Sequence, residues 1–182
     1  MTPPSVPILG GTGALGFGLA LRLAAQGVPV VIGSRSAERA QESAAKLRER
    51  LPEAQVEGLE NAAAATAGPI VALTVPFRNQ SENLTNLKSV LEPGQIVLDA
   101  TVPLAAAVSG KATRLLGVPQ GSAAEQAQEM APEGVRVVAG LHTVNAAHLA
   151  DLVEELDEDV PIAGDDKAAR QEVKELIERI PG

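Results

Sequence analysis

The chain has 182 residues, a formal net charge of −8 at pH 7 and no cysteine. The acidic balance disfavours a general binder of nucleic-acid backbones, and the lack of cysteine excludes a disulfide framework and a thiol nucleophile. With two histidines we expect no dedicated metal site, and no apolar run is long enough to span a bilayer. The N-terminus lacks the basic and apolar regions of a signal peptide. We therefore expect a cytoplasmic protein without nucleic-acid or membrane partners.

The first expected strand, residues 6–10, runs into a glycine-rich turn and then into a helix at 14–26. The turn, Gly11-Thr12-Gly13-Ala14-Leu15-Gly16, has the spacing of a dinucleotide-binding fingerprint. Its first glycine permits a tight turn, the second lets the backbone approach a pyrophosphate, and the third lets the helix pack close to the sheet. A lone motif of this kind also occurs as a structural turn. The strand before it and the helix after it favour a dinucleotide site.

The second expected strand, residues 28–33, is followed by Ser34 and Arg35, with Arg39 one helical turn later. An acidic residue here would bind both ribose hydroxyls of NAD and repel a 2′-phosphate, whereas an arginine can pair with that phosphate. These residues therefore predict NADP(H) rather than NAD(H). The alternative is a solvated helix start, in which Ser36 caps the helix and Arg39 is exposed.

Strands and helices alternate through the rest of the chain. Further strands are expected at 54–58, 69–74, 95–99, 135–140 and 160–163, and further helices at 36–50, 59–66, 79–90, 122–130, 143–153 and 165–180. This alternation predicts a Rossmann-like, doubly wound α/β fold with a mostly parallel sheet and helices on both faces. No linker divides the chain, so we expect residues 1–182 to form one NADP-binding domain.

In such a fold, ligands bind at the carboxyl ends of the strands. Val75-Pro76 offers a stiff apolar turn there, against which ribose and nicotinamide can rest. We expect Asp99, at the end of the next apolar strand, to cap the following loop rather than to act in catalysis. His142 is the one catalytic candidate, although a lone histidine more often has a structural role. The connection 100–134 is long, which favours a lid or a partner-contacting segment.

The sequence resembles the F420-dependent NADP reductases over nearly its whole length. The densest likeness runs from Leu9 to Ala24. It continues at Ile32-Gly33-Ser34-Arg35, Leu73-Thr74-Val75-Pro76, Leu141-His142-Thr143 and from Val160 to Asp166. The combination of Gly-Gly-Thr-Gly, Gly-Ser-Arg and Leu-His-Thr is more specific than a bare Rossmann fingerprint.

The resemblance implies an enzyme that passes a hydride between C4 of the nicotinamide of NADP(H) and C5 of the deazaflavin coenzyme F420. The residues that it implies for NADP(H) are Thr12–Leu15 at the pyrophosphate, Ser34, Arg35 and Arg39 at the 2′-phosphate, and Val75, Pro76, Ala139 and Gly140 around the nicotinamide. Reduction of F420 also takes up a proton, for which His142 or water is a candidate source. We further expect a homodimer or a higher homo-oligomer.

Two features depart from the family's pattern. Phe77 stands where the family commonly has tryptophan, which keeps a flat apolar ring. Family members typically continue past the last helix with a strand and a helical tail that help to form the deazaflavin pocket, whereas this sequence stops at Gly182. We therefore expect either a shortened chain or a pocket that closes differently.

Two other functions stay open. One is an NADP-dependent reductase of another small substrate, and the other is a non-catalytic NADP(H)-binding module. The chain has no tyrosine, so the Tyr–Lys proton relay of short-chain dehydrogenases is impossible. Hydride transfer requires two flat rings held at near contact distance and no obligatory acid, base or metal. A site without a clear catalytic dyad therefore suits this chemistry.

Overall fold

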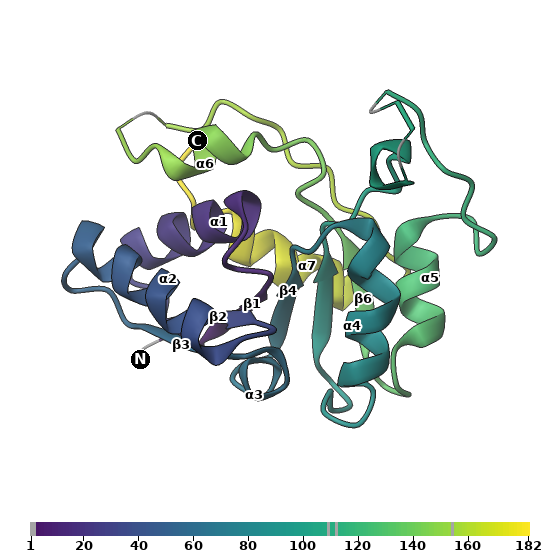
Figure 1. The fold of residues 1–182 in the computed structure, drawn as a ribbon, viewed down its shortest axis with the longest axis horizontal. Coiled ribbons are helices and arrows are strands. Elements are labelled where there is room, and N and C mark those ends of the chain that lie inside the picture. The colour runs from purple at the N-terminus through teal and green to yellow at the C-terminus, as the bar shows by residue number, and fades with distance from the viewer. Residues whose placement is uncertain (1–2, 109, 112, 154) are drawn as a thin grey trace.

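The computed structural model describes residues 3–108, 110–111, 113–153 and 155–182. In this part of the chain, six parallel strands form one sheet in the order β3-β2-β1-β4-β5-β6 (Figure 1). The strands are β1 Val6–Leu9, β2 Val30–Ser34, β3 Val56–Glu60, β4 Ile70–Leu73, β5 Ile96–Asp99 and β6 Arg136–Ala139. The direction of winding switches between β1 and β4, which confirms the expected Rossmann-like topology.

Helices cover both faces of the sheet. They are α1 Ala14–Ala25, α2 Ala37–Arg50, α3 Asn61–Ala65, α4 Gln80–Leu87, α5 Ala123–Met130, α6 Ala146–Ala150 and α7 Lys167–Ile177, with 3-10 turns η1 Phe77–Asn79 and η2 Ala105–Val108. Successive strand residues point to opposite faces, so Ile8 packs with α1, α2 and α7, whereas Leu9 packs with α3, α4 and α5. Within the described residues, no helix has the length and apolar character needed to cross a bilayer.

Two expected elements differ from the structure. Residues 160–163 do not form a strand, because Ala163 pairs with Ala139 in a single antiparallel bridge, with N···O distances of 2.7 and 3.0 Å. Pro161 has no N–H group with which to extend that pairing. The expected helix at 143–153 is reduced to α6, which starts after Asn145 because the side chain of Asn145 accepts a hydrogen bond from the Ala147 N–H at 2.9 Å. The other expected elements are present with small shifts at their ends.

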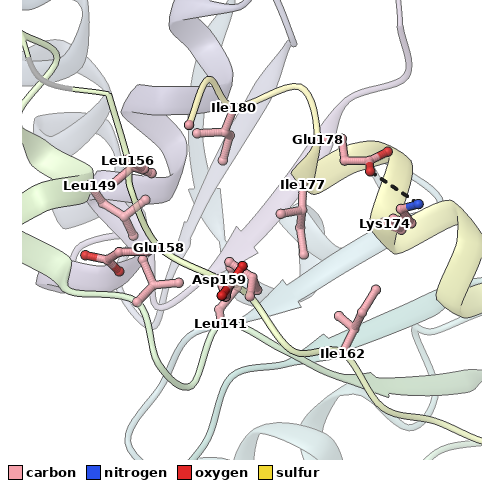
Figure 2. A pocket seen from close by; sticks show the side chains of 13 residues that line it. Leu141, Leu149, Leu156, Glu158, Asp159, Ile162, Lys174, Ile177, Glu178 and Ile180 are labelled. Carbon is pink, nitrogen blue, oxygen red and sulfur yellow. Dashed lines mark ion pairs between the residues drawn. The ribbon is translucent and has the colours of Figure 1, made fainter.

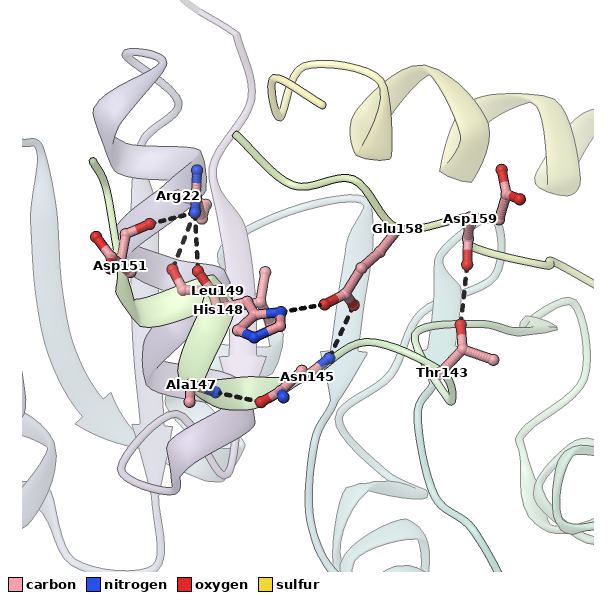
Figure 3. A network of polar contacts seen from close by, with 9 residues as sticks. All are labelled: Arg22, Thr143, Asn145, Ala147, His148, Leu149, Asp151, Glu158 and Asp159. Atoms are coloured by element: carbon pink, nitrogen blue, oxygen red, sulfur yellow. Dashed lines mark hydrogen bonds and ion pairs between the residues drawn. The ribbon is translucent and has the colours of Figure 1, made fainter. Parts of the chain in front are cut away.

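The connection after β6 crosses α1 before it returns to α7 (Figure 1). We call residues 141–153 and 155–162 the strap. Gly18 of α1 lets it approach closely, because a Cβ on Gly18 would lie 2.6 Å from the Cβ of Leu149. Arg22 is 5% exposed, and its guanidinium donates to the carbonyl oxygens of His148 at 2.8 Å, Leu149 at 3.1 Å and Asp151 (Figure 3). A buried cation therefore docks the strap on α1.

A second group of contacts closes the strap on itself (Figure 3). The carboxylate of Glu158 accepts hydrogen bonds from the Asn145 N–H at 2.9 Å and from Nδ1 of His148 at 2.7 Å. These bonds favour the ionised form and hold the pKa of Glu158 below its usual range. The hydroxyl of Thr143 donates to the Asp159 carbonyl oxygen at 3.0 Å. The two arms of the strap are thus joined on either side of Val144.

Candidate functional site

The turn between β1 and α1 has the geometry of a phosphate-binding loop. Gly10 adopts a φ of 83°, and its carbonyl oxygen accepts from the Gly13 N–H at 2.9 Å. A Cβ on Gly16 would lie 2.4 Å from Oγ1 of Thr74, so a glycine is needed for α1 to start this close to the sheet. Gly13 is the N-cap residue and has no side chain to occupy the helix terminus. The first N–H groups of α1 therefore remain for a bound anion.

A pocket of about 470 Å³ opens beside this turn. We call it the loop pocket. Its lining brings together expected cofactor residues from three separate turns, namely Thr12, Gly13, Ser34, Arg35, Arg39, Val75 and Pro76. Gly11, Ala14 and Leu15 belong to the turn but do not line the pocket. The three turns lie at the carboxyl ends of β1, β2 and β4, where ligands bind in this fold.

Two guanidinium groups stand at one end of the loop pocket. Arg35 and Arg39 are exposed, and neither makes an ion pair with any described residue. Ser36 caps α2 by accepting from the Arg39 N–H at 3.4 Å, as the solvated helix start predicted. Ser36 caps α2 while Arg35 and Arg39 line the pocket, so the helix cap does not exclude an anion site. The donor set, with two guanidinium groups and a helix N-terminus, fits a dinucleotide that carries an additional phosphate.

The sequence analysis missed an amide cluster that also lines the loop pocket. The side chain of Asn61 donates to Oδ1 of Asn83 at 3.0 Å, and Asn83 in turn donates to the Asn79 carbonyl oxygen at 2.7 Å. Oδ1 of Asn61 is buried and has no hydrogen-bond partner among the described residues. No motif marks these asparagines, because they come together only when α3 and α4 pack side by side.

A second pocket, of about 560 Å³, lies at the carboxyl ends of β5 and β6. We call it the outer pocket. Ala139 and His142 line it, although Ala139 was expected in the same site as Val75 and Pro76. The side chain of His142 is exposed. A Cβ on Gly140 would lie 3.0 Å from the side chains of Ile162 and Leu98, so the end of β6 is closely packed.

Part of the long 100–134 connection forms one wall of the outer pocket. Val102, Pro103, Leu115, Leu116 and Val118 supply an apolar lining. An isolated antiparallel bridge between Leu104 and Leu115 folds this segment back on itself. Ser109 and Ala112, which belong to the segment expected to form a lid, lie outside the described residues. The outer pocket thus combines an apolar wall with polar groups at the sheet edge.

Asp99 ends β5, between β4 and β6, and is fully buried at 0% exposure. Its Oδ1 accepts from the Thr101 N–H at 3.1 Å, which confirms the expected loop cap. Its Oδ2 accepts from the Thr101 hydroxyl at 3.1 Å and from Nε2 of Gln80 at 2.8 Å. Burial raises the pKa of Asp99, while these hydrogen bonds and the charge of His142 oppose the rise.

A third pocket, of about 340 Å³, lies between the strap and α7 (Figure 2). Leu141, Leu149, Ile162 and Ile177 are among its apolar lining residues, and none of the expected cofactor residues lines it. Leu141 is 2% exposed and has a φ of 66°, which L-residues rarely adopt. This conformation turns the chain at the end of β6, so that Leu141 is buried while the adjacent His142 is exposed.

Residues 5–103 match the family described as NADP oxidoreductase, coenzyme F420-dependent. The F420-dependent NADP reductase of Methanocaldococcus jannaschii is 42% identical over 181 residues, which cover 97% of this chain and 80% of that protein. The F420-dependent NADP reductase of Methanothermobacter marburgensis is 39% identical over 180 residues, with coverage of 97% and 80%.

Two solved structures share the fold of this chain over nearly its whole length. A protein of Arthrobacter sp. FB24 assigned as an F420-dependent NADP reductase superposes with a TM-score of 0.74 at 28% identity, covering 98% of this chain and 81% of that one. Glycerol-3-phosphate dehydrogenase of Coxiella burnetii superposes with a TM-score of 0.68 at 23% identity, covering 98% of this chain and 51% of that one. The second likeness concerns the fold alone.

Proposed function

The chain belongs to the family of F420-dependent NADP oxidoreductases, and we propose that it transfers a hydride between NADP(H) and F420 at the carboxyl edge of its sheet. The observation that carries the proposal is the loop pocket. There a glycine-rich helix N-terminus, two guanidinium groups and a stiff apolar turn line one cavity. In the direction of F420 reduction, NADPH, F420 and a proton give NADP⁺ and reduced F420.

The phosphate groups of NADP(H) are assigned to two parts of the loop pocket. The turn Gly11–Leu15 holds the pyrophosphate with backbone N–H groups and the positive end of the α1 dipole. Ser34, Arg35 and Arg39 hold the 2′-phosphate, because a guanidinium pairs with a phosphate in a fork geometry. This division makes Arg35 and Arg39 the residues that select NADP(H) over NAD(H).

The nicotinamide is assigned to the carboxyl edge of the sheet, between the turns that follow β4 and β6. Val75 and Pro76 flank it from β4, and Ala139 and Gly140 flank it from β6. F420 is assigned to the outer pocket, whose apolar wall suits a flat deazaflavin ring. The residues of this edge orient the two rings and exclude water, which is what hydride transfer requires. His142 faces the outer pocket and is the side-chain candidate for proton delivery.

A mixture of the protein, NADPH and F420, followed at the visible absorbance of the deazaflavin, tests this function. Loss of that absorbance with one equivalent of NADPH oxidised is the expected result. NADPH binding without turnover would favour a non-catalytic module, and NADPH oxidation with another small carbonyl or imine but not with F420 would favour the alternative reductase.

We also propose that the protein acts in the cytoplasm as a homodimer or a higher homo-oligomer. Val153 is 93% exposed, and burial of this apolar side chain between two copies of the chain would contribute to association. Light scattering of the purified protein measures the mass of the assembly. A monomeric mass at micromolar concentration would contradict this part of the proposal.

A further inference from the structure

Asp99 is a buried carboxyl group to which the proposed hydride transfer assigns no role. It ends β5, and its backbone pairs directly with Leu73 of β4 on one side and with Ala139 of β6 on the other. The Gly140 N–H donates to its carbonyl oxygen at 3.1 Å. Since neighbouring strands lie about 4.8 Å apart, the carboxyl group lies within roughly 10 Å of a ring held between the β4 and β6 turns.

The contacts of Asp99 fit a carboxylate. Its oxygens accept from the Thr101 N–H, the Thr101 hydroxyl and Nε2 of Gln80, and all of these groups are donors. Oγ1 of Thr101 also lies 2.8 Å from Nε2 of Gln80, so the hydroxyl, the amide and the carboxyl group form one compact cluster. The two N–H donors among these contacts reach both oxygens, one at Oδ1 and one at Oδ2, as an ionised carboxylate requires.

The partner of the carboxylate is itself held rigidly. Gln80 is 0% exposed, and its Nε2 lies 2.9 Å from the Ala123 carbonyl oxygen, so its two hydrogens are shared among three acceptors, while its Oε1 accepts from Gln126 at 2.7 Å. The amide thereby joins α4, the loop after β5 and α5. A fixed negative charge consequently stands in a low-dielectric layer beneath the nicotinamide edge, where charges act more strongly than in water.

We propose that Asp99 is an electrostatic positioning residue that stabilises the positively charged nicotinamide of NADP⁺ relative to the neutral ring of NADPH. The inference rests on the proposed function, because it requires the nicotinamide to lie between Val75-Pro76 and Ala139-Gly140. Loss of a hydride from NADPH leaves a positive charge on the ring, and the Asp99 carboxylate attracts that charge. Asp99 thereby makes bound NADPH the stronger hydride donor.

The test compares the affinities of the two cofactor forms in the absence of F420. NADPH fluorescence gives its Kd, and competition gives the Kd of NADP⁺. In Asp99→Asn the ratio of the NADP⁺ Kd to the NADPH Kd should rise about tenfold, because a unit charge at this range is removed without a change of shape. Thr101→Val is the matched control, since it removes the hydroxyl contacts with Asp99 and Gln80 but keeps the carboxylate. There the two Kd values should change together.

A ratio that stays within about twofold of the wild-type value in Asp99→Asn would overturn the inference and leave the proposed function intact. A wild-type protein that binds neither cofactor would instead overturn the proposed function. These two failures are therefore distinguishable without any measurement of turnover.

A second measurement covers the case in which Asp99→Asn does not fold. Among the described residues, His142 is the titratable side chain that acts on Asp99 electrostatically, while α4, the loop after β5 and α5 present amide and hydroxyl groups. In His142→Gln, the same Kd ratio should rise as the pH falls through the raised pKa of Asp99, because protonation removes the charge. The 2′-phosphate titrates in both cofactor forms and cancels in the ratio. A ratio that is flat across the acid range would overturn the inference.

Discussion

At the scale of single residues, the loop pocket depends on side chains that no other part of the fold requires. Arg35 and Arg39 are exposed and lack ion-pair partners among the described residues, so neither contributes an ion pair to the stability of the domain. Ser34, in contrast, is 7% exposed and lies at the end of β2. Substitution of Arg35 or Arg39 should therefore change cofactor binding without a large change in the stability of the domain.

We predict that Arg35→Ala lowers the preference for NADPH over NADH about tenfold or more, because charge-assisted hydrogen bonds to a phosphate contribute about 1.5–3 kcal/mol. The measurement is the ratio of the two Kd values by fluorescence titration. Lys46→Ala is the control, since Lys46 is an exposed cation on the same helix outside the loop pocket. An unchanged ratio in Arg35→Ala would refute the assignment of the 2′-phosphate.

Leu141 provides a prediction about backbone conformation. At its φ of 66°, glycine is free of the steric penalty that any Cβ brings, so Leu141→Gly should be more stable than Leu141→Ala by about 1 kcal/mol. Chemical denaturation of both variants measures the difference. The same pair of substitutions at Leu149, which is 1% exposed within α6, should give the opposite order, because glycine weakens a helix. If the Gly and Ala variants ranked in the same order of stability at Leu141 and at Leu149, the strained conformation of Leu141 would be contradicted.

At the scale of elements, the strap is the part of the molecule that links the sheet edge to α1. Its ends are pinned by the bridge between Ala139 and Ala163 and by the docking of α6 through Arg22. His142 belongs to the strap, so the position of this proton-donor candidate depends on how firmly the strap is held. The stability of the strap is therefore coupled to the geometry of the outer pocket.

We predict that Arg22→Met destabilises the protein by about 3 kcal/mol, because buried carbonyl oxygens lose a charged donor while the apolar stem is retained. Hydrogen exchange should become faster in α6. Arg50→Ala is the control, since Arg50 makes one exposed hydrogen bond to the strap, to the Ala150 carbonyl oxygen at 2.9 Å, and its loss should change the stability by about 0.5 kcal/mol or less. Equal exchange rates in both variants would show that Arg22 does not anchor the strap.

At the scale of the whole molecule, the two pockets lie at the carboxyl edge of one sheet. The loop pocket is built from the β1, β2 and β4 turns, and the outer pocket from the loops after β5 and β6. Hydrogen bonds of Asp99, Gln80 and Thr101 join the end of β5 to α4. Under the proposed function, this edge is the scaffold that holds both rings.

The 100–134 connection supplies the prediction at this scale. If it closes over the bound rings as a lid, NADP(H) should reduce proteolytic cleavage inside 105–121 at least severalfold, because a closed segment is less accessible to a protease. Limited proteolysis with and without the cofactor, followed by mass spectrometry, makes the comparison. Cleavage inside α2 serves as the internal control, since that helix lies outside the connection. Identical cleavage patterns in both states would argue against a lid.

Much of the fold and half of the candidate site could be predicted because their signals are local. The glycine-rich turn and the pair Ser34 and Arg35 carry their chemistry within a few residues of a strand end, and their strands then bring them together. The asparagine cluster could not be predicted in this way. Asn61 and Asn83 are 22 positions apart, and only the packing of α3 against α4 brings them into contact.

The amino-acid sequence by itself determined the alternation of strands and helices, the glycine-rich turn and the cations beside it, since each depends on local periodicity or local chemistry. The tertiary structure alone decided the strap, the left-handed conformation of Leu141 and the burial of Asp99 between β4 and β6. Arg22 and Leu149 illustrate the reason, because their hydrogen bond joins positions 127 residues apart. Contacts of this range depend on how the elements pack, and no local pattern encodes that packing.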